Sequence, residues 1–124
     1  MSTSQNIETA KKGYAAFAAG DVETVLSYYD DDVEWVVPGN STVSGTYRGK
    51  AEVTNFFAKL AEKSFTTTPS RFLAEEDVVV VLGQITAGGE SAPVADVLTY
   101  RGGKMVQLQN FSDTAMFERV YGKK

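Results

Sequence analysis

Asp96 is the residue whose type and surroundings most clearly favour chemistry in this chain of 124 residues. Two apolar residues precede it, two follow it, and no basic residue comes after it before Arg101. If the side chain points inward, its removal from water disfavours the charged carboxylate and raises the pKa of Asp96. Such a group acts in one of two ways: as a neutral acid that donates a hydrogen bond to a developing oxyanion, or as a general base near neutral pH.

Two non-catalytic roles of Asp96 are also open. In one, the Asp96 carboxylate faces solvent. In the other, it is a buried structural group whose oxygens are satisfied by tyrosine or amide donors, and Asn110 on the following strand is predicted to supply such an amide. Because perturbed carboxyl groups mark functional sites only statistically, the catalytic and structural roles of Asp96 both stay open.

Histidine and cysteine are absent from the chain. Their absence excludes Ser-His-Asp and Cys-His nucleophiles, zinc sites built on these residues, iron–sulfur clusters, thiol redox chemistry and disulfides. The acidic triplet at 30–32 lacks the spaced oxygens and bidentate Glu of an EF-hand loop, so a solvated turn is expected there. No Walker or GxGxxG loop follows a strand. We therefore expect no metal and no cofactor.

Charge and hydropathy narrow the range of partners. Twelve Lys and Arg against sixteen Asp and Glu give a net charge of −4, and no basic cluster is present to neutralise phosphates, so nucleic acid is not an expected partner. No segment approaches the ~20 apolar residues of a membrane span, and the polar start at 1–6 does not resemble a signal peptide. We expect a cytoplasmic protein without a membrane partner, folded as a single domain over residues 1–124.

Three helices are predicted in the first half of the chain. An apolar stripe over 7–18 predicts the first, which ends at Gly20, and Asp21 is placed to cap the second. The second helix is expected to stop at the acidic triplet 30–32, because carboxylates oppose the dipole at a helix C-terminus. The third helix follows Gly49, with apolar residues on one face and charged residues on the other.

Strands dominate the second half. Alternation over 33–37 predicts one strand, which the loop beginning at Pro38 ends. From Phe65 onward, Gly- and Asp-rich turns separate runs typical of antiparallel hairpins. These runs are Thr66 to Glu75, Val78 to Leu82, Ala92 to Tyr100 and Met105 to Phe111. Helices followed by hairpin-linked strands indicate an α+β fold.

The predicted sheet is apolar on both faces. The segments 78–82 and 94–98 are apolar at nearly every position, so both faces of the sheet must be covered. The three helices account for one face. We expect a second copy of the chain to cover the outer face, which makes the protein a homodimer.

The order of these elements and several short motifs resemble one family, the SnoaL-like and ketosteroid-isomerase-like branch of the nuclear-transport-factor-2-like superfamily. The motifs that carry the resemblance are Tyr14-Ala15-Ala16-Phe17-Ala18-Ala19-Gly20-Asp21, Asp31-Asp32-Val33-Glu34-Trp35, Pro38-Gly39, Gly45-Thr46-Tyr47-Arg48-Gly49-Lys50, Gly102-Gly103-Lys104 and Phe111-Ser112-Asp113-Thr114. The resemblance implies a cone, in which a curved antiparallel sheet wraps around three N-terminal helices and encloses an apolar pocket, usually in a homodimer.

The resemblance also supports Asp96. By its spacing to the Gly-Gly turn at 102–103, this residue is similar to the oxyanion-hole Asp of ketosteroid isomerases and to one of two catalytic Asp residues of limonene epoxide hydrolases. Tyr14 lies one position from the place of the isomerases' catalytic Tyr, which falls on Gly13. Asp113 is more typical of a local cap or turn.

Other catalytic positions of these relatives differ here. The isomerases' base falls on Val37. The hydrolases' Arg and second Asp fall on Val94 and Asn110. One carboxyl, Asp96, is left with Asn110 as its amide partner. A polar pair among apolar walls is typical of a ligand pocket, and the residues expected to form the walls are Tyr14, Tyr28, Tyr29, Trp35, Val37, Phe56, Phe72, Leu98, Tyr100 and Leu108.

The leading hypothesis is a pocket for a small hydrophobic molecule, in which Asp96 and Asn110 carry cofactor-free acid/base chemistry. Isomerisation, cyclisation and hydration, the last by an epoxide-hydrolase-like enzyme, all remain open. The alternative is a non-catalytic ligand-binding or structural homodimer that has lost the family's base. An ordinary core is the competing explanation for each wall residue taken singly.

Overall fold

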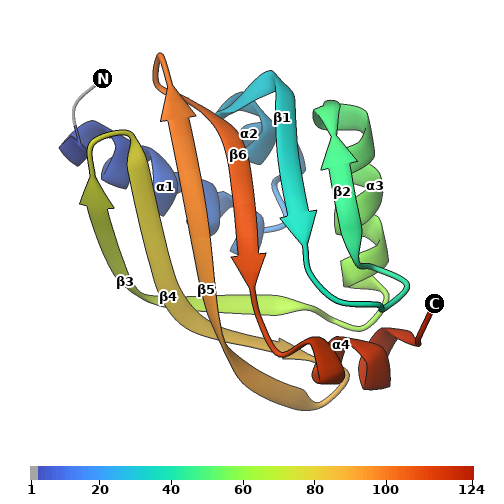
Figure 1. Cartoon of the computed structure of the whole chain (residues 1–124). Helices are drawn as coiled ribbons and strands as arrows, with labels where there is room; N and C mark the ends of the chain where they lie inside the picture. Colours follow the sequence, from blue (N-terminus) through green and yellow to red (C-terminus); the bar gives the residue numbers. More distant parts are fainter. Residues whose placement is uncertain (1–2) are drawn as a thin grey trace.

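The computed structural model describes residues 3–124 and places the strands in one curved six-stranded sheet (Figure 1). The sheet order is β2-β1-β6-β5-β4-β3. The elements are α1 (Thr3–Ala18), α2 (Val22–Ser27), β1 (Tyr29–Val37), β2 (Gly45–Arg48), α3 (Gly49–Ala61), β3 (Thr66–Glu75), β4 (Val78–Ala87), β5 (Glu90–Arg101), β6 (Lys104–Phe111) and α4 (Thr114–Tyr121). The predicted α+β cone is confirmed, with helices gathered on the concave side of the sheet.

One strand pair departs from the expected antiparallel sheet. β1 pairs with β6 in parallel, with Trp35 opposite Leu108, whereas the other neighbouring pairs are antiparallel. The connection from β1 to β6 passes through β2, α3 and three further strands, which is long enough for a parallel pair. This pairing brings the first strand beside the strand that carries Asn110.

The connection between α1 and α2 forms as predicted. Gly20 takes a φ of +73°, a left-handed conformation that glycine adopts without strain. The Asp21 side chain caps α2 by accepting a hydrogen bond from the backbone N–H of Thr24 at 3.2 Å. These two residues turn the chain sharply so that α2 returns toward the sheet.

The second helix is shorter than predicted. α2 ends at Ser27, and the acidic triplet at 30–32 lies inside β1 rather than at a helix end or in a turn. Tyr29 pairs with Met105 of β6, and this pairing uses backbone groups that a longer helix would need. The ammonium of Lys104 donates to the carbonyl of Ser27 at 2.6 Å, a favourable place for a cation at a helix C-terminus.

Two elements were not predicted, namely the short strand β2 and the C-terminal helix α4. α4 begins at Asp113, whose side chain accepts a hydrogen bond from the N–H of Met116 at 3.0 Å. The prediction that Asp113 is a local cap is therefore confirmed. Met116 and Phe117 are buried, and α4 lies at the end of the sheet opposite α2 (Figure 1).

Asn6 is a buried polar residue on α1 whose amide atoms lack a hydrogen-bond partner within the described chain. An unpaired buried polar group costs about 1–3 kcal/mol. We therefore predict that Asn6→Leu raises the free energy of unfolding by about that amount, as measured by urea denaturation. Asn55→Leu, on the exposed side of α3, is the control and should stay within roughly 0.5 kcal/mol of the wild type. An unchanged or lower stability of Asn6→Leu would contradict the prediction.

The outer face of the sheet presents apolar side chains. Val80, Leu82 and Val97 alternate with buried inner residues and are half-buried, while Leu73 and Phe111 are 42% and 54% exposed. Patches of this kind on a sheet face are typical of protein interfaces. This arrangement agrees with the expected homodimer, which stays a prediction.

Light scattering on a size-exclusion column at micromolar concentration is expected to give twice the mass of one chain. Val97→Lys should shift the mass to that of a monomer, because a charge in an apolar interface is left without a partner. Ala51→Lys, at an exposed position of α3, should leave the mass unchanged. A monomeric wild type would refute the dimer.

Candidate ligand-binding and active site

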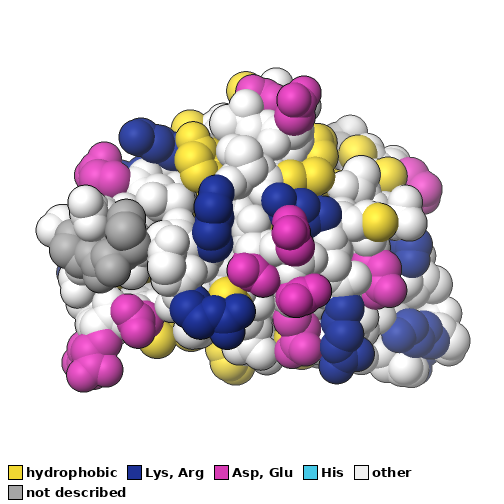
Figure 2. Space-filling view, turned by 90° about the horizontal axis from the view of Figure 1, so that it is seen from above, with side chains coloured by type: hydrophobic (Ala, Val, Ile, Leu, Met, Phe, Trp, Pro, Cys, Tyr) yellow, Lys and Arg dark blue, Asp and Glu magenta, His cyan; other side chains and the backbone are white. Residues whose placement is uncertain are grey.

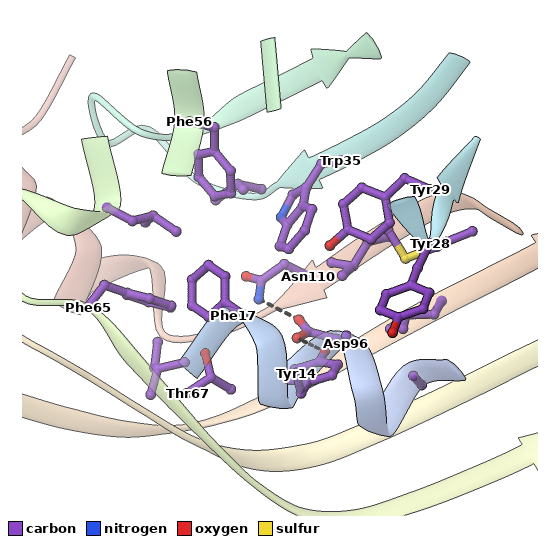
Figure 3. A pocket seen from close by; sticks show the side chains of 18 of the residues that line it. Tyr14, Phe17, Tyr28, Tyr29, Trp35, Phe56, Phe65, Thr67, Asp96 and Asn110 are labelled. Carbon is purple, nitrogen blue, oxygen red and sulfur yellow. Dashed lines mark hydrogen bonds between the residues drawn. The ribbon is translucent and has the colours of Figure 1, made fainter. Parts of the chain in front are cut away.

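A cavity lies between the inner face of the sheet and helices α1 and α3 (Figure 3). Its volume is about 50 Å³. Eleven of the predicted residues line it, namely Asp96, Asn110, Tyr14, Tyr28, Tyr29, Trp35, Val37, Phe56, Leu98, Tyr100 and Leu108. Nearly all of the predicted site is thus brought together around one space, and the polar pair faces that space.

Phe72 is the exception, and its prediction as a wall residue is wrong. It is absent from the lining and packs edge-on against Tyr14, with 5.8 Å between the ring centroids. Lys11 lies over the same ring at 5.8 Å. α1 packs across β3, so the helix covers this strand residue. Phe72 therefore supports Tyr14 from outside the cavity lining.

Further lining residues were not predicted. On α1, five lining residues share one helix face at spacings of three and four, and this periodicity could have identified the whole face. Other lining residues come from the far end of the cone, where the bend of the sheet decides which side chains meet. The unpredicted residues are Thr9, Ala10, Gly13, Phe17, Leu60, Phe65, Thr67, Ile85, Met105 and Phe117.

Asp96 and Asn110 form a cross-strand pair in the wall of the cavity. They lie directly opposite each other on β5 and β6 and are 6% and 8% exposed. The Nδ2 of Asn110 donates to Oδ1 of Asp96 at 2.8 Å. Ser112 donates its hydroxyl to Oδ1 of Asn110 at 2.6 Å. Ser112, which sequence reasoning gave no role, thereby holds the amide in the orientation that presents its N–H to the carboxyl.

Tyr14 supplies the second donor to Asp96 from α1. Its hydroxyl donates to Oδ2 of Asp96 at 2.6 Å, across a separation of 82 residues in the chain. Together with Asn110, it gives each oxygen of the carboxyl one protein donor. The dashed lines in Figure 3 mark both contacts. Tyr14, and not Gly13, is therefore the residue of α1 that touches the carboxyl.

The electrostatics of this cluster favour neutral side chains. Burial raises the pKa of Asp96, and the hydrogen bonds from Tyr14 and Asn110 oppose the shift without cancelling it. Burial also raises the pKa of Tyr14, and the negative charge of Asp96 raises it further. No lysine or arginine lines the cavity. Tyr14 is consequently a neutral donor, and Asp96 binds its proton more tightly than an exposed aspartate.

The charged side chains of the surface contrast with this buried carboxyl. Figure 2 shows acidic and basic groups interspersed over one face of the molecule. Among the charged side chains of the protein, Arg119 and Glu90 form an ion pair at 2.8 Å. Within residues 3–124 no cluster of acidic groups could hold a metal ion. No helix in the same range is long and apolar enough to cross a membrane.

At two of the positions where the resemblance implies further catalytic groups, 37 and 94, the structure has buried valines. Val37 lines the cavity and is 4% exposed, whereas Val94 is buried without lining it. Asp96 is the only carboxyl among the lining residues. Acid or base chemistry by a carboxyl group in the cavity thus depends on this one residue.

Comparisons with known proteins agree with this geometry. Residues 10–108 match the SnoaL-like domain. An uncharacterised protein of Mycobacterium tuberculosis, Rv0034, is 26% identical over 130 residues, covering 98% of this chain and 99% of its own. Bal32a, from a soil-derived mobile gene cassette, has the same fold, with a TM-score of 0.89, 24% identity, and coverage of 96% of this chain and 98% of its own.

A further similar structure is TerC, which was co-crystallised with polyporic acid. It has a TM-score of 0.84 and is 29% identical, covering 94% of this chain and 98% of its own. The domain match spans well over half of the sequence, and the cone with its enclosed cavity agrees with it. The chain therefore belongs to the family of proteins with a SnoaL-like domain.

Proposed function

We propose that the protein binds a mostly hydrophobic small molecule in the cone and carries out cofactor-free acid/base chemistry on it through Asp96. The observation that carries this proposal is the buried Asp96 carboxyl, held between Tyr14 and Asn110 in an otherwise apolar cavity. Burial raises the pKa of Asp96 above that of an exposed aspartate, a shift that suits a group which both takes and returns a proton. TerC, similar in fold and 29% identical, supports the choice of polyporic acid as a test compound.

The proposed proton transfer needs no other titratable side chain. The Asp96 carboxylate takes a proton from a carbon of the ligand, and the same group returns it at a different atom of the ligand. The net change is an isomerisation when the proton returns to another carbon. It is a cyclisation when the carbanion first attacks a carbonyl carbon of the same ligand, which opens the C=O π bond, and Asp96 returns the proton to the resulting alkoxide oxygen. No electron acceptor is consumed, and Asp96 ends in the state in which it began.

A second function, binding without chemistry, is favoured by two observations. Both oxygens of Asp96 already accept hydrogen bonds from the protein, as expected of a structural carboxyl. The valine at position 37 also leaves the cavity without a second base. In this case the protein holds its ligand and releases it unchanged.

The size of the cavity sets a condition on either function. Ligand pockets usually have volumes of roughly 300–1,000 Å³, whereas this one has about 50 Å³. A polycyclic ligand therefore enters only when aromatic side chains of the wall rotate. Trp35, the only tryptophan of the chain, lies in that wall, and its fluorescence should change when a ligand binds.

The test combines binding and product analysis. Wild-type protein is titrated with a panel of polycyclic phenols, quinones and ketones that includes polyporic acid, with calorimetry and Trp35 fluorescence as readouts. Bound compounds are then incubated and analysed by chromatography. An enzyme should yield product, and Asp96→Asn should lower the rate by about 100-fold or more, as expected for the loss of an acid/base group.

The matched control is Asp77→Asn, because Asp77 lies exposed in the turn between β3 and β4. This variant should retain both binding and turnover. Binding without product would favour the non-catalytic function. Absence of binding by every compound, or an unchanged rate in Asp96→Asn, would contradict the proposed chemistry.

A further inference from the structure

We propose that Ser112 is a positioning residue of the site, which acts on Asp96 through the amide of Asn110 and favours the ionised form of the carboxyl. This inference rests on the proposed function, because it gives Ser112 a part in preparing the base that takes a proton from the ligand. It is tested on the free protein, so its outcome does not depend on the discovery of a ligand.

Three side chains form one hydrogen-bonded chain that begins outside the cavity and ends at its carboxyl. Oγ of Ser112 donates to Oδ1 of Asn110 at 2.6 Å, and Nδ2 of Asn110 donates to Oδ1 of Asp96 at 2.8 Å. Figure 3 shows the amide directed at the carboxyl. Asp96 and Asn110 line the cavity, whereas Ser112 is half-buried and lies outside the lining. Ser112 therefore reaches the carboxyl through the amide alone.

The backbone on both sides of Ser112 is held in place. Phe111 is the last residue of β6 and pairs with Ala95 of β5. Asp113 begins the next element, since its side chain caps α4 by accepting a hydrogen bond from the N–H of Met116 at 3.0 Å. The end of a strand and the start of a helix thus fix the place of the Ser112 hydroxyl. A group that orients a functional side chain requires such a rigid support.

The Asn110 amide has two possible orientations toward Asp96, and they favour opposite states of the carboxyl. With its NH₂ group toward Asp96, the amide donates to an ionised carboxylate, which only accepts hydrogen bonds. With its oxygen toward Asp96, the amide would repel the carboxylate and accept a hydrogen bond from the protonated acid. The structure has the first orientation, in which the amide oxygen accepts the proton of Ser112. The serine donor therefore supports the orientation that the carboxylate requires.

The charge of Asp96 makes this support larger for the carboxylate than for the neutral acid. Hydrogen bonds in a chain polarise one another, and bonds that end on a charged group are stronger than neutral ones. The proton of Ser112 thus strengthens the bond from Asn110 most when Asp96 is ionised. Burial raises the pKa of Asp96, and the hydrogen bond from Asn110 opposes that rise. Removal of the Ser112 hydroxyl should weaken this opposition and raise the pKa of Asp96 further.

The other groups around Asp96 leave this effect open to measurement. Tyr14 donates to the second carboxyl oxygen, Oδ2, at 2.6 Å and does so without Ser112. Among the described residues that line the cavity, Asp96 is the only one with a charged side chain, whichever helix or strand contributes them. Burial raises the pKa values of Tyr14, Tyr29 and Tyr100, so these residues stay neutral at physiological pH. Asp113 is exposed and directs its carboxylate to α4.

The titration of Asp96 in the free protein tests the proposal. The aspartate carboxyl carbons are labelled with ¹³C and followed by NMR, and the signal of Asp96 is identified by its loss in Asp96→Asn. Ser112→Ala should raise the pKa of Asp96 by about 0.5 to 1 pH unit, the range of one hydrogen bond. Ser112→Thr keeps a hydroxyl and should titrate like the wild type. A purely structural role of the serine would not produce this rescue together with a shift in the titration.

A double variant shows whether the effect passes through the amide. In Asn110→Ala the connecting group is missing, so adding Ser112→Ala should leave the titration of Asp96 where Asn110→Ala alone has it. Ser91→Ala is the matched control, because Ser91 is an exposed serine of β5 whose hydroxyl is bonded to that of Thr86 at 2.9 Å. This variant should titrate like the wild type.

The outcomes separate this proposal from the proposed function. An unchanged or lowered pKa of Asp96 in Ser112→Ala would overturn the role of Ser112, even if the wild type converts a ligand. An equal shift with and without Asn110 would also overturn it, because Ser112 would then act by another route. Failure of every test compound to bind or react would contradict the proposed function and leave the titration result intact. A raised pKa in Ser112→Ala, absent in Ser112→Thr and in the Asn110→Ala background, would support the proposal.

Discussion

Gly83→Ala is expected to destabilise the fold by about 3 kcal/mol or more, an effect at the upper end for a single added methyl group. A Cβ at position 83 would lie 2.3 Å from the carbonyl oxygen of Thr68 and 2.8 Å from Cα of Pro69. Both are backbone atoms, so no side-chain rotation relieves the contact. Either the two strands must move apart or the variant unfolds.

The close approach has a structural purpose in the sheet. β3 and β4 change register between Pro69 and Arg71, opposite Gly83, and both strands bend sharply along their length (Figure 1). Pro69 has no N–H for the ladder, and glycine removes the side chain that would separate the strands. The bend wraps the sheet around α1 and gives the cavity its depth. Gly83→Ala should therefore damage the site as well as the stability.

Urea denaturation followed by Trp35 fluorescence measures this effect. Gly13→Ala is the matched control. Gly13 lies in the interior of α1, and its added Cβ would lie 3.9 Å from Tyr28, an ordinary van der Waals distance. Alanine is favoured over glycine there by about 1 kcal/mol, so the same substitution should stabilise at position 13 and destabilise at position 83. A loss below about 1 kcal/mol for Gly83→Ala would show that the strands separate easily.

The second half of the fold was predictable because strand alternation and turn chemistry point to the same boundaries. The run from Thr66 to Glu75 was predicted with the bounds that β3 has. The turn at 102–103 also matches its hairpin, and both glycines there have positive φ values. The acidic triplet at 30–32 misled the prediction, because the flanking residues Tyr29 and Glu34 pair with β6 and hold the segment between them in β1. This pairing joins segments more than 70 residues apart.

The residues of the candidate site could be predicted only where the sequence of one strand, or of two consecutive strands, identifies them. Asp96 stands out because its neighbours are apolar, and Asn110 follows from the pairing of consecutive strands. The bond from Tyr14 to Asp96 depends on the rotation of α1 over the sheet, which the helix period does not fix. Phe72 shows the limit of the prediction. Its strand was predicted correctly, but the sequence of that strand does not show that α1 covers the Phe72 side chain.

The wild type is expected to lose stability as the pH rises above 4, and the Asp96→Asn variant is expected not to show this loss. Burial raises the pKa of Asp96 in the folded protein, whereas an unfolded aspartate titrates near pH 3.9. Between these two values the folded state holds the proton and the unfolded state has released it. The free energy of unfolding therefore falls as the pH increases through this window.

Asparagine stays neutral throughout the window, so the stability of the variant does not depend on the titration of residue 96. The difference in stability between variant and wild type should grow in favour of asparagine from pH 4 upward and level off above the folded pKa. Each unit by which the folded pKa exceeds the unfolded pKa contributes about 1.36 kcal/mol. Other carboxyl groups titrate in both proteins and cancel in the difference, so urea denaturation between pH 4 and 8 measures the pKa shift of Asp96 directly.

Tyr14→Phe tests the same electrostatics in the opposite sense. The hydrogen bond from Tyr14 lowers the pKa of Asp96 against the effect of burial, so its removal should raise that pKa further. The pH-dependent loss of stability should then extend to higher pH in Tyr14→Phe and disappear in the double variant Tyr14→Phe/Asp96→Asn. Parallel stability profiles for the wild type and Asp96→Asn would mean that the carboxyl titrates normally. That result would remove the basis for a proton-transfer role of Asp96, since an exposed-like pKa leaves it ionised and weakly basic at neutral pH.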